Sequence, residues 1–479
     1  MRKMPVVVAG LLAFPFVSAA QTLSPAVQAF VKVNAPVVAL THVRVIDGTG
    51  VAAREDQTIV LSNGKIESVS DASSANVPKD AQVLDLHGDT VIPGIVGMHE
   101  HMFYPAGDAI FHEMPISFPR LYLAGGVTTA RTAGSIEPYM DLALKKEIDD
   151  GKVAGPHMHV TSPYLEGPGS WAPQMTALRD SDEAQAAVNF WADRGVDNFK
   201  AYNFISRATL KTAIDAAHRR GLKVTGHLCS IGFKEAVDLG IDDLEHGLIV
   251  DAEFFSGKKP DECPDEEAFT QELVKMQVTD APIQETIHYL AAHHVAVTST
   301  LPVFELFNPG KVPLQQRVLD AMSQEARNQF LEARVRLDLP RNPKDGLPRP
   351  WGRAYEMEKE FERSFVKAGG LLMAGEDPTG MGGDLPGFGD QRELELLVEA
   401  GFTPIEAIHI ATFNGAQYLG ELDRIGTIAA GKQADLVVIK GDPSKKIEDI
   451  ENVETVFKDG VGYDSAKLIE SVRGLVGVR

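Results

Sequence analysis

The 479-residue sequence contains only two cysteines, Cys229 and Cys263. Two cysteines cannot cross-link a chain of this length into a disulfide-built scaffold, so the fold must rest on a hydrophobic core. The two could pair in an oxidising compartment, although no feature of the sequence shows that they do. We expect Cys229 to be a buried free thiol.

Basic residues are fewer than acidic ones. The chain has 46 Lys and Arg against 67 Asp and Glu, which gives a formal net charge of −21. It contains no run of six basic residues. Binding to nucleic acid depends on clustered Lys and Arg that displace counterions from phosphates. We therefore expect no nucleic-acid partner.

Beyond the first 20 residues, no segment reaches 18 uninterrupted apolar residues. The N-terminus itself has two basic residues, an apolar stretch over 4–16 and the small residues Val17-Ser-Ala-Ala20. This pattern predicts a signal peptide over residues 1–20, cleaved near Ala19 or Ala20, and a periplasmic or secreted protein. A membrane anchor is the alternative, but the stretch is too short to span about 30 Å of hydrocarbon. After cleavage we expect no membrane contact.

The pattern of apolar and polar residues changes twice along the chain. Residues 36–90 and 422–465 contain short alternating β segments, with the hairpin signal Asn63-Gly64 in the first. Between them, apolar strands alternate with helical patterns, at Val91–Met98, Val127–Arg131, His157–Ser162, Val196–Ala201, Leu222–His227, Asp242–His246, Val295–Thr300 and Leu371–Glu376. The pattern predicts an α/β fold, a TIM-type (β/α)8 barrel over 91–421, with a small β-sandwich domain built from both chain ends. Residues 251–366 are expected to be an insertion, either a substrate lid or a solvated helix pair.

Two His-X-His pairs occur, and their positions differ. His99 and His101 follow the first predicted barrel strand, at the end where barrel active sites are built. His157 and His159 open a strand, at the opposite end, and we interpret them as structural.

Four further polar residues lie at equivalent strand ends, namely Lys200, His227, His246 and Asp377. Each alone is more often a core or capping residue. Together with His99 and His101 they converge on one barrel mouth, and imidazole and carboxylate are ligands that zinc and similar metals prefer. The set has no packing rationale, so it predicts a metal site.

Several ordered segments make the chain resemble a known family. They are Val43-Arg-Val-Ile-Asp-Gly-Thr-Gly50, Val91-Ile-Pro-Gly-Ile-Val-Gly-Met-His-Glu-His101, Gly126-Val-Thr-Thr-Ala-Arg131, Ala411-Thr-Phe-Asn-Gly-Ala416 and Gly426-Thr-Ile-Ala-Ala-Gly-Lys-Gln-Ala-Asp-Leu436. The chain resembles the amidohydrolase superfamily, in the imidazolonepropionase-like and Xaa-Pro dipeptidase-like branch that includes ochratoxin-degrading amidases. The resemblance covers nearly the whole chain after residue 20.

The resemblance implies two divalent metal ions, with zinc as the expected metal. His99, His101 and Asp377 would hold the more buried ion and His227 and His246 the second. Lys200, carboxylated by CO₂, would bridge the two, since burial beside a dication favours the neutral amine that reacts. The ions would share a hydroxide that attacks the carbonyl, and Asp377 would carry its proton to the leaving nitrogen.

Substrate contacts are harder to infer. Tyr202 shares a strand face with Lys200 and could donate to a substrate carboxylate or to the oxyanion. Arg131 could pair with a carboxylate, although a structural salt bridge is the commoner outcome. The sequence departs from the family pattern at Gly167-Pro-Gly-Ser-Trp171, which lacks a histidine, and at Glu376-Asp377-Pro378. We expect both changes to border the substrate pocket.

The sequence thus predicts an exported hydrolase of amide bonds in dipeptides or N-acyl amino acids, with a small-molecule substrate. The alternatives are a cyclic-amide or ester hydrolase with one metal, and a binding protein that kept the ligands without turnover. The sequence leaves open whether the chain forms a homo-oligomer.

Overall fold

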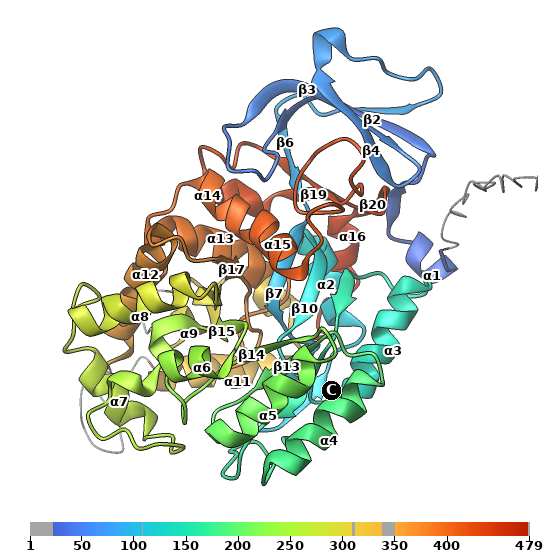
Figure 1. Ribbon diagram of the computed structural model, residues 1–479. Helices are drawn as coiled ribbons and strands as arrows, with labels where there is room; N and C mark the ends of the chain where they lie inside the picture. Colours follow the sequence, from blue (N-terminus) through green and yellow to red (C-terminus); the bar gives the residue numbers. More distant parts are fainter. Residues whose placement is uncertain (1–22, 108, 309–311, 338–349, 478–479) are drawn as a thin grey trace, which may run out of the picture.

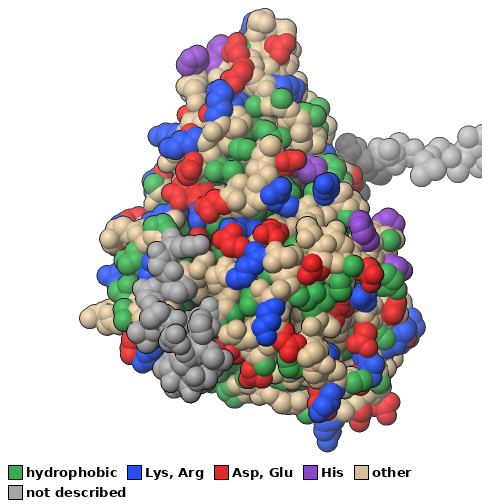
Figure 2. Space-filling view, turned by 90° about the vertical axis from the view of Figure 1, so that its left-hand side faces the viewer, with side chains coloured by type: hydrophobic (Ala, Val, Ile, Leu, Met, Phe, Trp, Pro, Cys, Tyr) green, Lys and Arg blue, Asp and Glu red, His purple; other side chains and the backbone are tan. Residues whose placement is uncertain are grey.

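The computed structural model describes residues 23–107, 109–308, 312–337 and 350–477. The predicted signal peptide lies outside these residues. Figure 1 shows a body of strands and helices with a separate sheet layer above it, and Figure 2 shows that the molecule tapers toward that layer. On the face in Figure 2, acidic and basic side chains are interspersed. Within the described ranges, no helix is both long and apolar enough to cross a bilayer.

Both ends of the chain build the upper layer. From the N-terminal side come β1 (Val31–Val33), β2 (Val37–Val45), β3 (Arg54–Ser62), β4 (Lys65–Asp71), β5 (Gln82–Asp85) and β6 (Asp89–Pro93), and from the C-terminal side β18 (Leu436–Lys440), β19 (Val453–Lys458) and β20 (Val461–Asp464). They form one hydrogen-bonded sheet in the order β1-β20-β19-β18-β6-β2-β3-β4, with β5 paired to β2. The two ends meet in two strand pairs, where β18 runs antiparallel to β6 and where β1 runs antiparallel to β20. Side chains from both ends share one apolar core, which includes Leu40, Ile59, Leu436 and Phe457.

The turn between β3 and β4 is the hairpin that the sequence predicts. Asn63 and Gly64 both have positive φ, 50° and 77°, and Ser62 pairs with Lys65 around them. Two consecutive positive φ values match the right-handed twist of the flanking strands, which is why Asn-Gly is favoured there.

The lower body is built on parallel strands. Each predicted barrel segment contains at least one: β7 (Ile95–Glu100), β10 (Val127–Thr132), β11 (His157–His159), β12 (Thr161–Leu165), β13 (Asn198–Ala201), β14 (Lys223–Gly226), β15 (Asp243–Glu245), β16 (Ala296–Ser299) and β17 (Leu372–Ala374). They form two parallel sheets, β11-β10-β7 and β12-β13-β14-β15-β16-β17. The last strand adjoins the first, because the Asp377 amide donates to the His99 carbonyl at 3.1 Å.

Two expected strands each proved to be two: His157–Ser162 contains β11 and part of β12, and Val91–Met98 contains parts of β6 and β7. The segment Val91–Met98 divides at Pro93-Gly94: β6 belongs to the upper sheet and β7 to the parallel strands. A Cβ at Gly94 would lie 1.9 Å from the Thr128 hydroxyl, so only glycine fits where the chain passes between the two layers.

Helices follow most of the strands and cover them. They include α2 (Ser117–Gly125), α3 (Pro138–Asp149), α4 (Ser181–Ala192), α5 (Arg207–His218), α6 (Phe233–Leu239), α8 (Ala281–Ala292), α12 (Trp351–Lys367) and α13 (Phe388–Ala400). In α5, Leu210, Ile214 and Ala217 are buried on one face. Spacing of three and four residues places these side chains on one stripe toward the strands.

Residues 251–366, the predicted insertion, contain the strand β16 at the place where a strand is expected, and the covering helices α8 and α12. The remaining elements are α7 (Glu266–Leu273), α9 (Leu301–Leu306), α10 (Gln316–Ala321) and α11 (Gln324–Leu337). The last two are separated by a short break at Met322.

The expected free thiol at Cys229 is wrong. Cys229 is buried but forms a disulfide with Cys263, with the two Cα atoms 4.9 Å apart. The bond joins the end of β14 to the loop before α7.

Candidate metal centre and substrate cavity

His99, His101 and Asp377 meet at the C-terminal ends of β7 and β17. The Nε2 atoms of His99 and His101 each lie 3.5 Å from an oxygen of Asp377. All three side chains are at least 89% buried. Their ligand atoms lie within 4.8 Å of one another, close enough for one ion to contact all three.

The opposite nitrogens of the histidines are already engaged. His99 Nδ1 lies 2.7 Å from Glu245 Oε2, His101 Nδ1 lies 3.1 Å from the Gly134 carbonyl, and His246 Nδ1 lies 2.7 Å from Thr300 Oγ1. Such partners fix the tautomer and turn Nε2 toward a metal. Burial lowers the pKa of His101 and His246 well below the usual value, which favours the neutral ligand form.

His227 and His246 complete the far side of the same cluster. Their ring centroids are 4.5 Å apart, and the His246 centroid is 4.5 Å from that of His99. His246 and Asp377 have positive φ, 69° and 62°. Non-glycine residues rarely adopt this conformation, and such residues gather at functional sites.

Lys200 lies fully buried beneath these rings. Its Nζ is 3.5 Å from Glu245 Oε1 and has no hydrogen-bond partner among the described residues. Burial lowers the pKa of Lys200, although Glu245 opposes the shift. An unsatisfied buried amine is costly, so this atom fits a carbamate that would ligate metal better than a free ammonium.

Arg131, an expected substrate contact, lies under the cluster and does not line the cavity. Its side chain is fully buried, donates to Asp243 at 2.8 Å and Glu245 at 3.0 Å, and reaches the Met98 carbonyl at 2.7 Å. Side chains of parallel strands alternate between faces, and Arg131 fills the interior below the mouth. The structure therefore places it as a support of Glu245.

Sequence reasoning missed Glu245 and Thr300, which hold His99 and His246 from behind. Glu245 also contacts Arg131 and Lys200. Its carboxylate therefore lies between three buried side chains, the imidazole of His99, the guanidinium of Arg131 and the amine of Lys200. The only signal available was its place beside His246 at a strand end.

A cavity of about 610 Å³ opens above the cluster. All six predicted ligands and Tyr202 line it, and the Tyr202 ring centroid is 4.9 Å from that of His227. Eight further aromatic side chains contribute to the wall, namely Phe103, Phe111, Tyr164, Trp171, Phe204, Phe269, Phe304 and Phe307. Of the two family departures, Trp171 borders the cavity as expected, whereas Glu376 is fully buried and does not line it.

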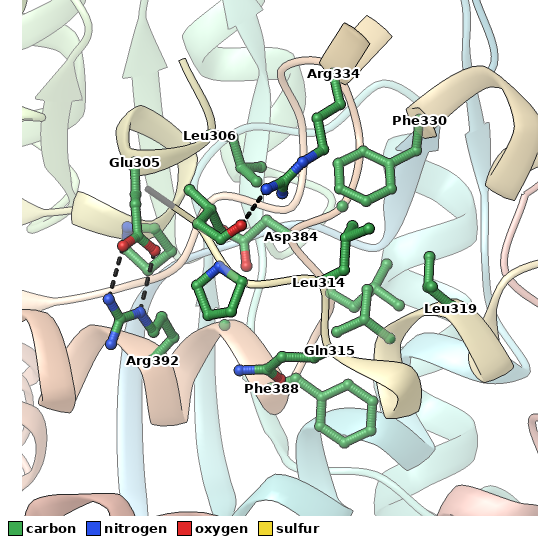
Figure 3. Close-up of a pocket in the computed structure, with 17 residues that line it drawn as sticks. Glu305, Leu306, Leu314, Gln315, Leu319, Phe330, Arg334, Asp384, Phe388 and Arg392 are labelled. Carbon is green, nitrogen blue, oxygen red and sulfur yellow. Dashed lines mark hydrogen bonds and ion pairs between the residues drawn. The ribbon is translucent and has the colours of Figure 1, made fainter. Parts of the chain in front are cut away.

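A second, smaller cavity of about 50 Å³ lies near α9 and α13. Two of its charged side chains pair: Arg392 donates to both oxygens of Glu305, at 3.0 and 2.6 Å (Figure 3). Arg334 donates to the Val312 carbonyl, and Asp384 Oδ2 has no hydrogen-bond partner among the described residues. None of the six predicted metal ligands lines this cavity.

The second His-X-His pair lies away from the cluster. His157 Nε2 is 3.1 Å from Asp459, and His159 Nε2 is 3.5 Å from Glu421. Both acids come from the C-terminal part of the chain, so these histidines contact the segments that close the fold.

Solved structures with this fold include several hydrolases. A Xaa-Pro dipeptidase with bound methionine is 20% identical and aligns with a TM-score of 0.65 over 89% of this chain and all of that one. Aspergillus niger ochratoxinase is 18% identical (TM-score 0.63, 90% and 96% covered), and bottromycin amidohydrolase is 19% identical (0.71, 94% of each). At these identities the likeness establishes the fold alone.

Among curated proteins, a dihydroorotase of Anaeromyxobacter dehalogenans is 32% identical over 105 residues, 22% of this chain and 23% of that protein. The chain thus spans about a quarter or less of the length of the curated relatives it matches. The amidohydrolase family model matches residues 90–300 and 362–461, most of the chain. That family has a TIM barrel with a separate sheet domain, in agreement with the parallel strands and the upper sheet. The chain therefore belongs to the amidohydrolase family, whose members are hydrolases that act on C–N bonds.

Proposed function

We propose that the chain is an exported, metal-dependent amidohydrolase that cleaves amide bonds of dipeptides or N-acyl amino acids. One observation carries the proposal: six ligand-type side chains converge on the floor of one cavity, and three of its histidines present Nε2 because Nδ1 is engaged.

The residues fit two divalent ions, with zinc expected from the nitrogen-rich donor set. His99, His101 and Asp377 would hold one and His227 and His246 the other, with carboxylated Lys200 between them. Ions bound there would acidify a water molecule and polarise the scissile carbonyl.

Within this arrangement Asp377 is the proton shuttle. One of its oxygens would accept the proton of the attacking water and deliver it to the amide nitrogen as the C–N bond breaks. Tyr202, at the cavity wall beside His227, would donate a hydrogen bond to the oxyanion or to a substrate carboxylate. Burial raises the pKa of Tyr202, which keeps its hydroxyl protonated as a donor.

Export is supported by two features. The N-terminal residues have the pattern of a cleaved signal, and the Cys229–Cys263 disulfide suits an oxidising compartment.

The proposal is tested by hydrolysis of a panel of dipeptides and N-acyl amino acids, before and after dialysis against a chelator. We expect turnover to be lost on chelation and restored by Zn²⁺, because metal chemistry supplies the nucleophile. Circular dichroism of the chelated protein serves as the folding control. Hydrolysis that survives chelation in the folded protein would contradict the proposal, and turnover of cyclic amides alone would favour the one-metal alternative.

A further inference from the structure

We propose that Glu266 binds a protonated amino group of the substrate, so that the enzyme acts on amides whose acyl part carries a free ammonium. Dipeptides with a free N-terminus belong to this class, and N-acyl amino acids do not. The inference rests on the proposed function and narrows its substrate class.

The cavity wall carries little charge outside the metal site. Apart from the six metal-site side chains, Glu266 is the one charged residue among the described residues that line the cavity. The same described wall has no arginine, and its single lysine is Lys200. A substrate carboxylate thus meets no basic partner along this wall, whereas a cation meets a carboxylate.

The carboxylate of Glu266 lacks a partner of opposite charge among the described residues. In the described part of the chain, no residue forms a hydrogen bond or an ion pair with this carboxylate. The Thr270 hydroxyl donates to the backbone carbonyl of Glu266, not to its side chain. Burial, with the negative charges of Asp265 and Glu267 nearby, raises the pKa of Glu266. A bound ammonium would offset both effects, since an opposite charge stabilises the ionised carboxylate.

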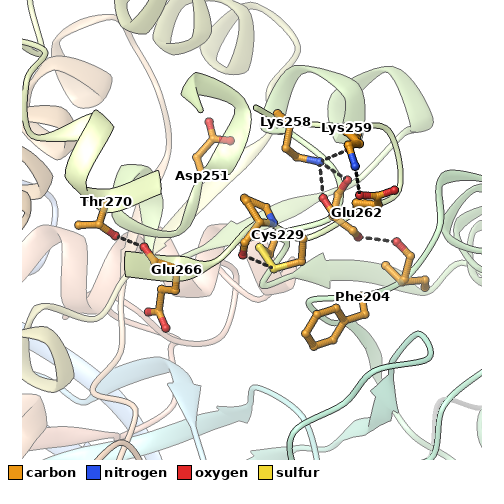
Figure 4. Close-up of a disulfide and its surroundings, with 12 residues drawn as sticks. Phe204, Cys229, Asp251, Lys258, Lys259, Glu262, Glu266 and Thr270 are labelled. Carbon is orange, nitrogen blue, oxygen red and sulfur yellow. Dashed lines mark hydrogen bonds and ion pairs between the residues drawn. A yellow bond between two sulfur atoms is a disulfide. The ribbon is translucent and has the colours of Figure 1, made fainter. Parts of the chain in front are cut away.

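The loop that carries Glu266 is tied to the strand end that carries His227. Cys229 lies two residues after His227, and its disulfide partner Cys263 lies three residues before Glu266. Lys258 Nζ fastens the same loop by donating to the carbonyls of Ser230 at 2.6 Å and Glu262 at 2.9 Å. Figure 4 shows the side chains of Glu266 and Phe204 below the disulfide, to its left and to its right, and both residues line the cavity.

Aromatic side chains line the same cavity as this carboxylate. Phe204 and Phe269 are among them, and Trp171 packs against Phe111 with ring centroids 6.0 Å apart. The N-terminal residue of a hydrophobic dipeptide carries an ammonium next to an apolar side chain. The ammonium would pair with the Glu266 carboxylate, and the apolar side chain would contact the aromatic residues of the cavity.

Binding of 2-phenylethylamine and of its neutral isostere 2-phenylethanol, measured by calorimetry on the metal-loaded protein, tests the proposal without turnover. We expect the amine to bind about tenfold more tightly, a preference lost in Glu266→Gln, because a single partly buried ion pair contributes on this order. Glu262→Gln removes one charge from the same loop outside the cavity and should keep the preference. Equal binding of both probes by the parent protein, or a preference that survives in Glu266→Gln, would overturn the proposal.

The kinetic counterpart compares phenylalanyl-proline with N-acetyl-phenylalanyl-proline. We expect kcat/KM to favour the free amine about tenfold in the parent and to become nearly equal in Glu266→Gln. Faster cleavage of the acetylated peptide by the parent would overturn the inference while leaving amide hydrolysis intact. An amine preference in binding that depends on Glu266, without cleavage of any amide, would instead support the ammonium site and contradict the proposed function.

Discussion

Asp377→Asn is expected to lower kcat by about 10²–10⁴-fold and to change KM little, because a proton transfer made by a positioned carboxylate matters chiefly in the transition state. The oxygens of Asp377 lie 3.5 Å from the Nε2 atoms of His99 and His101, so its second proposed role is to hold a metal. Asparagine keeps one oxygen at the same place but cannot accept and return the proton.

Metal content measured on the same sample separates the two roles. A large fall in kcat with metal content retained assigns the loss to proton transfer. An increase in KM with kcat unchanged would contradict the shuttle role of Asp377.

Arg131→Met is expected to lower the free energy of unfolding by about 3–5 kcal/mol, because it leaves buried carboxylates without their counter-charge. Arg131 is the partner of both Asp243 and Glu245 inside the fold, and no part of it reaches the cavity. The measurement is the urea unfolding midpoint, with KM determined on the folded fraction.

The matched control is Arg473→Met. Arg473 also pairs with two acids, Asp320 and Glu470, but on the surface. Exposed ion pairs contribute little to stability because solvent screens them, so this variant should unfold near the parent midpoint. If Arg131→Met unfolded like the parent protein but had a raised KM, Arg131 would be a substrate contact after all.

The strand ends were predictable because parallel strands have a simple sequence pattern. Short apolar runs separated by helical periodicity located β13 and β14, and the residues just after them, such as His227, then had to share one edge. The six candidate ligands meet there because topology alone brings strand ends together, without detail of side-chain packing.

Residues whose role depends on a partner far away in the sequence could not be predicted in this way. Glu245 and Arg131 are 114 residues apart, and only the packed interior shows that the two pair. The disulfide joins a strand end to a loop 34 residues later, and its formation depends on how that loop folds back. Glu266 likewise reaches the cavity only through that loop.

The boundary between the two layers was also invisible in the sequence. Val91–Met98 is one apolar run, and periodicity cannot indicate that its halves pair with different sheets. Pro93-Gly94 was the available signal, since proline and glycine mark interruptions in strands.

The central claim is that Lys200, as a carbamate, joins two metal ions on the floor of the cavity. Elemental mass spectrometry of the purified protein beside Lys200→Ala tests it most directly. We predict about two equivalents of metal in the parent and a sharp loss in the variant, because the shared ligand would be gone. About one equivalent in both proteins, indifferent to Lys200, would contradict the claim and support a single-metal site.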